Sequence, residues 1–250
     1  WKKTSVSFLI KQLTKVALAS IAIGVALPLV ILMEFSLPAT IAMALSAWII
    51  LGMVKDIANK TANKPDLITG LRSLSYSYYG MQAAHFGIAL MVTGVALTSY
   101  FSTEKSVLLD AGQSIDVGSY VFTLEGSSQV RGPNYVGDEV AMLVTKAGVP
   151  IATLLPQRRI YIATGTPSTE MAIDAGFLRD LFVTLGEQKE SGAWSMTIYV
   201  KPFIRWIWLG AIFMAFGGSL AAADKRYRKL KKRAEDKALI NAGEALQPVS

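Results

Sequence analysis

Four long apolar segments dominate the pattern of hydrophobic and polar positions along the chain. They cover residues 16–33, 35–54, 73–103 and 206–223. Each is close to or above the roughly 20 residues that a helix needs to cross the hydrocarbon core of a bilayer. The third segment contains no titratable side chain apart from His85 and several tyrosines. The pattern therefore predicts an α-helical membrane protein with four transmembrane helices.

Residues 104–201 have a different pattern, because short runs of β-branched and aromatic residues alternate with Gly- and Pro-containing turns. Such runs between turn signals are typical of strands. The expected strands are 120–124, 140–145, 151–155, 160–163, 181–185 and 194–200. This segment predicts an all-β domain, a sandwich or partial barrel, inserted between the third and fourth helices.

The distribution of lysine and arginine predicts the orientation of the helices. Basic residues precede the first span, occupy the segment between the second and third spans, and follow the fourth. Cytoplasmic flanks are enriched in lysine and arginine, so we expect both termini in the cytoplasm and the β domain in the periplasm. The expected parts are residues 1–54 (N-terminal segment and first two helices), 55–72 (cytoplasmic loop), 73–103 (third helix with His85), 104–201 (periplasmic β domain), 202–223 (fourth helix) and 224–250 (basic cytoplasmic tail).

Composition supports a membrane protein and excludes several kinds of site. Hydrophobic residues make up 52% of the chain and charged residues 17%, against about 25% charged in soluble domains. The absence of cysteine excludes disulfides, thiolate metal sites and covalent c-type haem attachment to this chain. The net charge of +7 comes mainly from residues 224–233, which hold seven basic residues and one acidic residue. No nucleic-acid partner is therefore expected. Residues 234–250 lack apolar periodicity and are expected to be disordered.

His85 is the only histidine of the chain and lies inside the third predicted span. A polar group in hydrocarbon is costly without a partner, so an intramembrane histidine suggests a functional site. Three interpretations remain open from the residues alone: a hydrogen-bonded structural histidine, a proton-transfer group, and a haem or metal ligand. A shortage of nearby intramembrane carboxylates argues against proton transfer. A second protein ligand to haem would be Met or would come from another polypeptide.

Small residues recur at helical spacing in the third and fourth spans, where they allow close helix contact. The two predicted packing stripes are Gly80, Ala84, Gly87, Gly94 and Thr98, and Gly210, Ala211, Ala215, Gly218 and Ala222. Two basic groups have alternative interpretations. Arg158 and Arg159 either clamp a carboxylate or haem propionate or end a solvated strand. Lys201 and Arg205, with the neighbouring tryptophans, either anchor the helix at the membrane interface or bind an anion.

Several ordered motifs resemble the C-terminal part of the CcmF family, the haem lyase subunits of bacterial cytochrome c maturation. The motifs are Gly80-Met-Gln-Ala-Ala-His85-Phe-Gly87, Pro156-Gln-Arg-Arg-Ile-Tyr161, Thr169-Glu-Met-Ala-Ile-Asp174, Arg179-Asp-Leu-Phe-Val-Thr-Leu-Gly186, Tyr199-Val-Lys-Pro-Phe-Ile-Arg-Trp-Ile-Trp208 and Asp224-Lys-Arg-Tyr-Arg228. The resemblance extends from about the second span to Arg228.

The resemblance implies a bacterial inner-membrane subunit that joins haem to apocytochrome c through thioether bonds. It implies that His85 is an axial ligand of a transmembrane haem b, which takes electrons from quinol and reduces incoming haem. The implied partners are the upstream half of the lyase, a haem chaperone, thiol-reducing maturation subunits and apocytochrome c. The resemblance assigns no catalytic residue. The family's tryptophan-rich periplasmic motif, its periplasmic histidines and its first transmembrane histidine are absent, so the chain alone is expected to be inactive.

Two other functions remain as alternatives. A membrane-anchored scaffold would dock maturation partners on its β domain, and His85 would then only pack between helices. A transporter fragment is the third interpretation. Transporters usually combine broken helices with polar groups that converge near the middle of the membrane, and this pattern is not evident. A haem chromophore that depends on His85 distinguishes the lyase from the scaffold.

Overall fold

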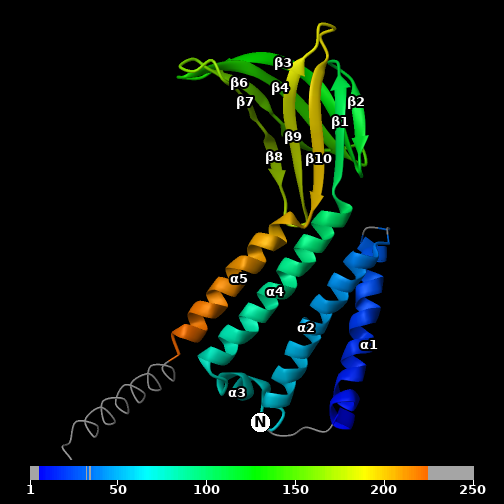
Figure 1. The fold of residues 1–250 in the computed structure, drawn as a ribbon, viewed down its shortest axis with the longest axis vertical. Coiled ribbons are helices and arrows are strands. Elements are labelled where there is room, and N and C mark those ends of the chain that lie inside the picture. The colour runs from blue at the N-terminus through cyan, green and yellow to red at the C-terminus, as the bar shows by residue number, and fades with distance from the viewer. Residues whose placement is uncertain (1–5, 32, 34, 225–250) are drawn as a thin grey trace, which may run out of the picture. The chain divides into compact units, whose positions relative to one another are not determined.

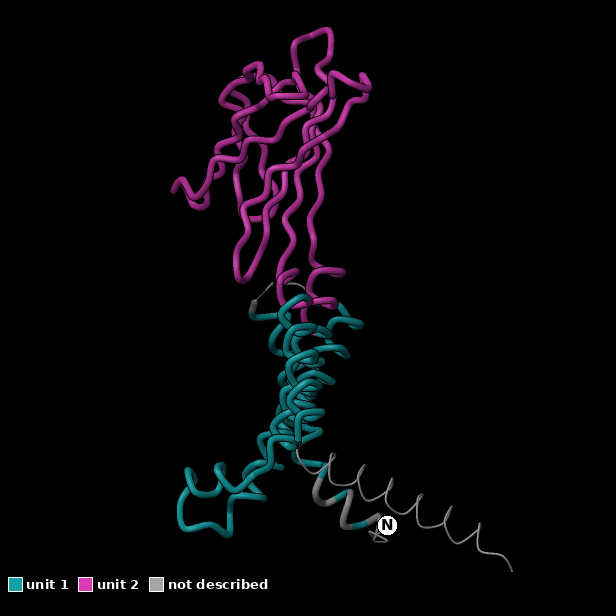
Figure 2. Tube along the Cα trace, turned by 90° about the vertical axis from the view of Figure 1, so that its left-hand side faces the viewer, with its two compact units in different colours: residues 1–92, 208–250 teal, residues 93–207 magenta. Residues whose placement is uncertain are grey.

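The computed structural model describes residues 6–31, 33 and 35–224, which fall into two compact units (Figure 2). The first unit comprises residues 1–92 and 208–250, and the second comprises residues 93–207. Glu34 and the basic tail from residue 225 onwards, including the part expected to be disordered, lie outside the described residues.

Four helices in the described residues are long and apolar enough to cross a membrane (Figure 1). They are α1 (Val6–Ile31), α2 (Leu37–Thr61), α4 (Tyr76–Phe101) and α5 (Ile204–Ala222). Ten strands separate α4 from α5 in the chain. The predicted fold class, four membrane helices with an inserted all-β domain, is confirmed.

The segment between the second and third spans contains more helix than the loop expected there. Helix α2 continues seven residues past position 54, to Thr61, whose hydroxyl donates to the carbonyl of Ile57 at 3.0 Å. A short helix α3 (Leu67–Arg72) follows, and Asp66 caps its N-terminus by accepting the backbone N–H of Thr69 at 2.7 Å. The hydrogen bonds from Thr69 hold the pKa of Asp66 below its usual value. Asp224, after α5, likewise accepts the backbone N–H of Ser77 at the start of α4.

Helices α4 and α5 pack backbone against backbone in the first unit. A Cβ atom added at Gly87 would lie 2.5 Å from the carbonyl oxygen of Gly210, and one at Gly80 would lie 2.5 Å from that of Gly217. The rings of Phe86 and Phe213 meet edge to face beside this contact, with centroids 5.2 Å apart. These glycines therefore allow an approach that no other residue type permits.

The predicted stripe on α4 faces α5, and Gly210 of the predicted α5 stripe makes the contact, whereas the prediction for Gly218 is wrong. Gly210 and Gly217 make the contact with a seven-residue spacing. At Gly218 no atom of the described residues lies within 4 Å of the position that a Cβ would occupy. The sequence contains adjacent glycines at 217 and 218, so spacing alone did not identify the one that packs.

The second unit is a β-sandwich of two antiparallel sheets. The four-stranded sheet has the order β1-β10-β9-β8, and the other has the order β2-β3-β4-β6-β7 with β5 paired to β4. The strands are β1 (Thr103–Leu109), β2 (Ser114–Val117), β3 (Tyr120–Arg131), β4 (Tyr135–Lys146), β5 (Val149–Leu154), β6 (Gln157–Tyr161), β7 (Pro167–Glu170), β8 (Ala172–Ala175), β9 (Arg179–Gln188) and β10 (Trp194–Pro202). Terminal strands β1 and β10 pair with each other, so the domain begins and ends beside the helices it joins.

Alternating side chains from both sheets form one core. On β3 and β4 the inward positions include Phe122, Met142 and Val144, and on β9 and β10 they include Val183 and Ile198, all fully buried. Inward-facing positions of this kind are how two packed sheets bury their apolar surface. The six predicted strands all exist, whereas β1, β2, β7 and β8 were not predicted.

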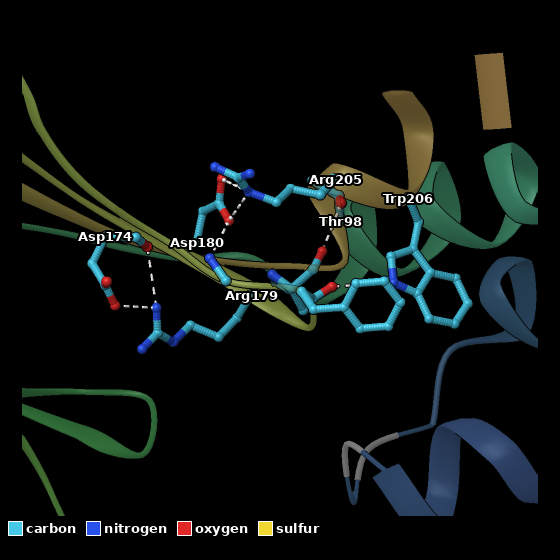
Figure 3. Close-up of polar contacts among 9 residues, drawn as sticks. Thr98, Asp174, Arg179, Asp180, Arg205 and Trp206 are labelled. Atoms are coloured by element: carbon cyan, nitrogen blue, oxygen red, sulfur yellow. Dashed lines mark hydrogen bonds and ion pairs between the residues drawn. The ribbon is translucent and has the colours of Figure 1, made fainter. Parts of the chain in front are cut away.

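The ends of α4 and α5 that belong to the second unit are tied to the sandwich by polar contacts (Figure 3). The hydroxyl of Thr98 donates to the carbonyl of Pro202 at 2.7 Å. Arg205 donates through Nε to Asp180 Oδ1 at 3.0 Å, and Trp206 donates through Nε1 to the carbonyl of Phe177 at 3.1 Å. These bonds fix the sandwich to the helix ends next to it.

Asp180→Ala is expected to destabilise the sandwich by about 1–3 kcal/mol, because it removes a buried hydrogen-bonded carboxylate. Asp180 is 5% exposed and accepts from both Arg205 and the backbone N–H of Gly176. The measurement is the midpoint of thermal unfolding of the purified protein in detergent. Asp116→Ala, at an exposed carboxylate on β2, is the matched control and should leave the midpoint nearly unchanged. Equal midpoints for the two variants would contradict the assigned role.

Candidate functional site

His85 is exposed on α4, in the N-terminal half of that helix. Its Nδ1 atom is 2.8 Å from the backbone carbonyl oxygen of Met81, one turn earlier. A carbonyl oxygen can only accept, so Nδ1 carries the proton in this contact and Nε2 keeps a free lone pair. A neutral imidazole held in this way has a fixed tautomer and could bind a metal through Nε2.

A pocket of about 260 Å³ adjoins His85 in the first unit. Residues from α2 and α4 line it: Trp48, Ile49, Gly52, Met53, Asp56, Met81, Gln82 and His85. Most of these are apolar, and Gly52 leaves space because no described atom lies within 4 Å of its would-be Cβ. A flat apolar macrocycle could approach His85 along this wall. The donor and the lining therefore fit one face of a haem, to which α4 would supply a single imidazole.

A polar network occupies the end of the same pocket. Asp56 Oδ2 accepts from the hydroxyl of Tyr78 at 2.7 Å and from Gln82 Nε2 at 3.2 Å, and it pairs with Lys60 at 3.2 Å. Gln82 is 7% exposed and also donates to the hydroxyl of Tyr78 at 2.7 Å. Each member has a partner, so the network joins α2 to α4 without leaving a buried polar group unpaired.

Asp56 corrects one premise of the sequence analysis. A carboxylate does line the pocket beside His85, although the sequence suggested a shortage of such groups. The signal was present, since Trp48, Gly52 and Asp56 follow helical spacing, but the second span was expected to end before Asp56. The continuation of α2 to Thr61 places this residue on the face that meets α4.

The basic residues considered as anion sites have partners within the chain. Arg158 pairs with Glu187 at 3.1 Å, and Arg159 with Glu170 at 3.6 Å. Arg159 also stacks on the ring of Tyr135 at 4.4 Å. These contacts favour the structural interpretation of both arginines.

The residues at the start of α5 likewise have structural contacts. Arg205 pairs with the buried Asp180, and Lys201 lies over the ring of Tyr199 at 5.2 Å. Trp208 is 72% exposed, as expected for a tryptophan at a membrane interface.

No group of three or more His, Asp or Glu side chains in the described residues is placed to hold a metal ion. A haem, whose porphyrin supplies most of the iron ligands, would need only a single imidazole such as that of His85 from this part of the chain. A second protein ligand would be Met or would come from another polypeptide, because His85 is the only histidine.

Comparison with known proteins gives a consistent set of relatives. Residues 100–202 match the family described as "CcmF C-terminal beta-sandwich". The chain is 41% identical to cytochrome c-type biogenesis protein CcmF of Pseudomonas aeruginosa and 43% identical to that of Pseudomonas fluorescens, in each case over 94% of this chain. It is 44% identical to CcmF of Escherichia coli over 62% of this chain.

The matched segments cover 36% of each Pseudomonas protein and 24% of the Escherichia coli protein. The matched part is thus little more than a third of the length of the Pseudomonas proteins and about a quarter of the Escherichia coli protein. A solved structure described as "Cytochrome c Heme Lyase CcmF" superposes with a TM-score of 0.69 over 88% of this chain and 35% of that chain, at 17% identity. This last likeness concerns the fold.

Proposed function

Because the chain corresponds to the C-terminal part of the CcmF cytochrome c biogenesis proteins, we propose that it is the C-terminal portion of a cytochrome c haem lyase. In this proposal His85 would hold a transmembrane haem b through Nε2. That haem would supply the redox chemistry for reduction of incoming haem before its thioether attachment to apocytochrome c. The observation that carries the proposal is the imidazole of His85, held by Met81 with its Nε2 free beside an apolar pocket.

The residues around His85 have separate tasks in this proposal. When bound, haem b supplies a one-electron redox centre within the membrane. The carbonyl of Met81 fixes the imidazole tautomer and the plane of the ring, so that no reorganisation is needed at the ligand. Trp48, Met53 and Met81 form an apolar wall beside the ligand. Apolar surroundings of this kind would influence the reduction potential of an iron held there.

The network of Asp56 serves to position the two helices that line the pocket. Its hydrogen bonds from Tyr78 and Gln82 connect α2 to the first two turns of α4, which precede His85. Lys60 compensates the charge of Asp56, at 3.2 Å. The carboxylate is thus kept near His85 without an uncompensated charge in the wall of the pocket.

The four apolar helices and the similarity to CcmF indicate a multipass inner-membrane protein. We further propose that both termini are cytoplasmic and that the sandwich of residues 103–202 lies in the periplasm, where cytochromes c are assembled. The proposed partners belong to the same maturation system: the upstream half of the lyase, a haem chaperone, thiol-reducing subunits and apocytochrome c. Quinol is the proposed electron donor.

The test compares the chain alone with the chain co-expressed with the upstream part of the lyase. Reduced-minus-oxidised visible spectra and haem quantitation should show haem b in the pair and little in the chain alone, because one histidine provides one axial ligand. Covalent haem attachment to a co-expressed apocytochrome c should likewise require both parts. Haem b retained by the upstream part without this chain would contradict the proposal.

The scaffold interpretation predicts a different result in the same preparation. A chain that only docks partners through its sandwich would capture maturation subunits in a pull-down. The chain paired with the upstream part of the lyase would then show no haem signal that depends on His85. Deleting the sandwich then gives a second comparison, which is practical because β1 and β10 are paired and the cut ends lie close together. Loss of partner capture with retention of the haem spectrum would assign docking to the sandwich and haem binding to the helices.

A further inference from the structure

The turn between β8 and β9 exposes two large apolar side chains. Phe177 is 65% exposed and Leu178 is 56% exposed. Neither belongs to the core of the sandwich, which is formed by other residues. Two adjacent exposed apolar residues at a turn require a reason other than folding of this domain, and their position supplies one.

The turn is bonded directly to the first turn of α5. The backbone N–H of Phe203 donates to the carbonyl of Leu178 at 2.9 Å, and Trp206 Nε1 donates to the carbonyl of Phe177 at 3.1 Å. The rings of Phe177 and Trp206 are 5.7 Å apart. Helix α5 begins at Ile204 and is apolar enough to cross the membrane. The turn therefore lies at the level where this helix enters the bilayer.

The conformation of the turn is fixed before any membrane contact. The backbone N–H of Gly176 donates to the carbonyl of Arg179 at 2.9 Å and to Asp180 Oδ1 at 3.0 Å. On the helix side, Phe203 takes a φ of 55°, unusual for a phenylalanine, and packs on Trp206 with ring centroids 5.0 Å apart. The exposed side chains are thus held in place without the cost of ordering a flexible loop.

The two arginines next to the turn are paired with carboxylates. Arg179 is bonded to Asp174, and Arg205 to Asp180, as the dashed lines in Figure 3 show. Paired charges and the exposed apolar side chains of Phe177 and Leu178 suit the boundary between headgroups and acyl chains rather than a cluster of anionic headgroups. Arginine and tryptophan side chains are also common at this depth.

We propose that Phe177 and Leu178, together with Trp206, form a membrane-interface anchor by which the sandwich rests on the lipid bilayer. The occupant of this apolar surface is lipid at the boundary of the acyl chains, and the anchor does not depend on anionic lipid. It holds the sandwich at a third point, in addition to its two covalent connections to α4 and α5. The proposal is independent of haem binding at His85.

The absence of cysteine from the chain makes a site-specific test direct. Phe177→Cys, labelled with an environment-sensitive nitrobenzoxadiazole dye, is placed in the full chain together with the upstream part of the lyase in phosphatidylcholine nanodiscs. Lipids with a nitroxide near the headgroup should quench most of the dye's emission. Leu178→Cys gives a second, independent probe in case the first variant folds poorly.

Ile162→Cys is the matched control, since Ile162 is 60% exposed at the β6–β7 turn of the same sandwich. Its dye should be quenched little by the same lipids. Equal quenching at 177, 178 and 162 would overturn the proposal. A blue-shifted but unquenched dye at both 177 and 178 would also overturn it, because protein would then cover the turn. Quenching that appears only after phosphatidylglycerol is added would overturn the neutral character of the anchor.

Discussion

His85→Ala is expected to remove most of the haem b from the protein when the chain is paired with the upstream part of the lyase. The contact with Met81 uses Nδ1 and leaves the lone pair of Nε2 available. The alanine side chain has no atom that can replace Nε2. Changes that only disturb the support of a metal ligand cost about 10–100-fold in affinity, so removal of the ligand should reduce haem content by more than about tenfold. The measurement is haem per protein from the pyridine haemochrome spectrum of purified membranes.

The matched control for this prediction is Ile212→Ala. Ile212 is 65% exposed on α5 and is absent from the lining of the pocket. Its replacement should leave haem content unchanged while removing a similar amount of apolar surface. Protein yield and helix content of both variants are measured alongside. Haem content that is equal in the two variants would mean that His85 packs between helices, as the scaffold interpretation requires.

Gly87→Ala is expected to separate α4 from α5 and to lower the stability of the helix pair strongly. The new Cβ would lie 2.5 Å from the carbonyl oxygen of Gly210 and 2.8 Å from the backbone nitrogen of Met214. Both neighbours are backbone atoms, so relief requires the helices to move apart. Overpacking of this kind costs about 1–3 kcal/mol and occasionally more. The measurement is the midpoint of unfolding when sodium dodecyl sulfate is added to the protein in mild detergent, with helix content monitored by circular dichroism.

Gly218→Ala provides the control because it makes the same chemical change on the partner helix at a position with open space in the described structure. Its unfolding midpoint should stay the same or rise slightly, since alanine favours helix over glycine by about 0.8–1.0 kcal/mol. Gly217→Ala tests the other close contact of the helix pair, because its Cβ would meet the backbone of Gly80 and Ala84. A Gly87→Ala protein as stable as Gly218→Ala would show that the two backbones are farther apart than described.

The sequence was most informative where one strong physical requirement acts alone. Each membrane helix must satisfy its own backbone and bury apolar side chains in lipid, so the spans were visible as uninterrupted apolar runs. The strands that were predicted, such as those containing Phe122, Val144 and Val183, supply fully buried side chains to the sandwich core. Burial on one face forces the alternating pattern that identifies a strand.

The features that were missed depend on neighbours distant in sequence. Strands β7 and β8 have four residues each and end the two sheets opposite β2 and β1, and β7 begins with Pro167. Their pairing with β6 and β9 defines them more than their own residues do. The choice between Gly217 and Gly218 similarly depends on the position of α4. Short edge strands and helix registers of this kind carry a weak local signal.

The candidate site was predicted in part. His85 was identified because a polar residue inside an apolar span is rare, but its bond to Met81 required coordinates. Asp56 was assigned to a loop, because two charged residues, Lys55 and Asp56, follow the second apolar run directly. The structure instead continues α2 through them and satisfies Asp56 with Tyr78 and Gln82 from α4. A membrane helix can thus extend past its apolar run when a neighbouring helix provides partners for its charges.

Chemical rescue of a ligand cavity tests the assignment of His85 most directly. The paired protein carrying His85→Gly is prepared with and without added imidazole, and its visible and electron paramagnetic resonance spectra are recorded. If His85 ligates the iron, the glycine variant loses the six-coordinate low-spin haem b signal, and imidazole restores it because the small ligand can occupy the vacated position. A glycine variant that shows the unchanged low-spin spectrum without imidazole would contradict the assignment.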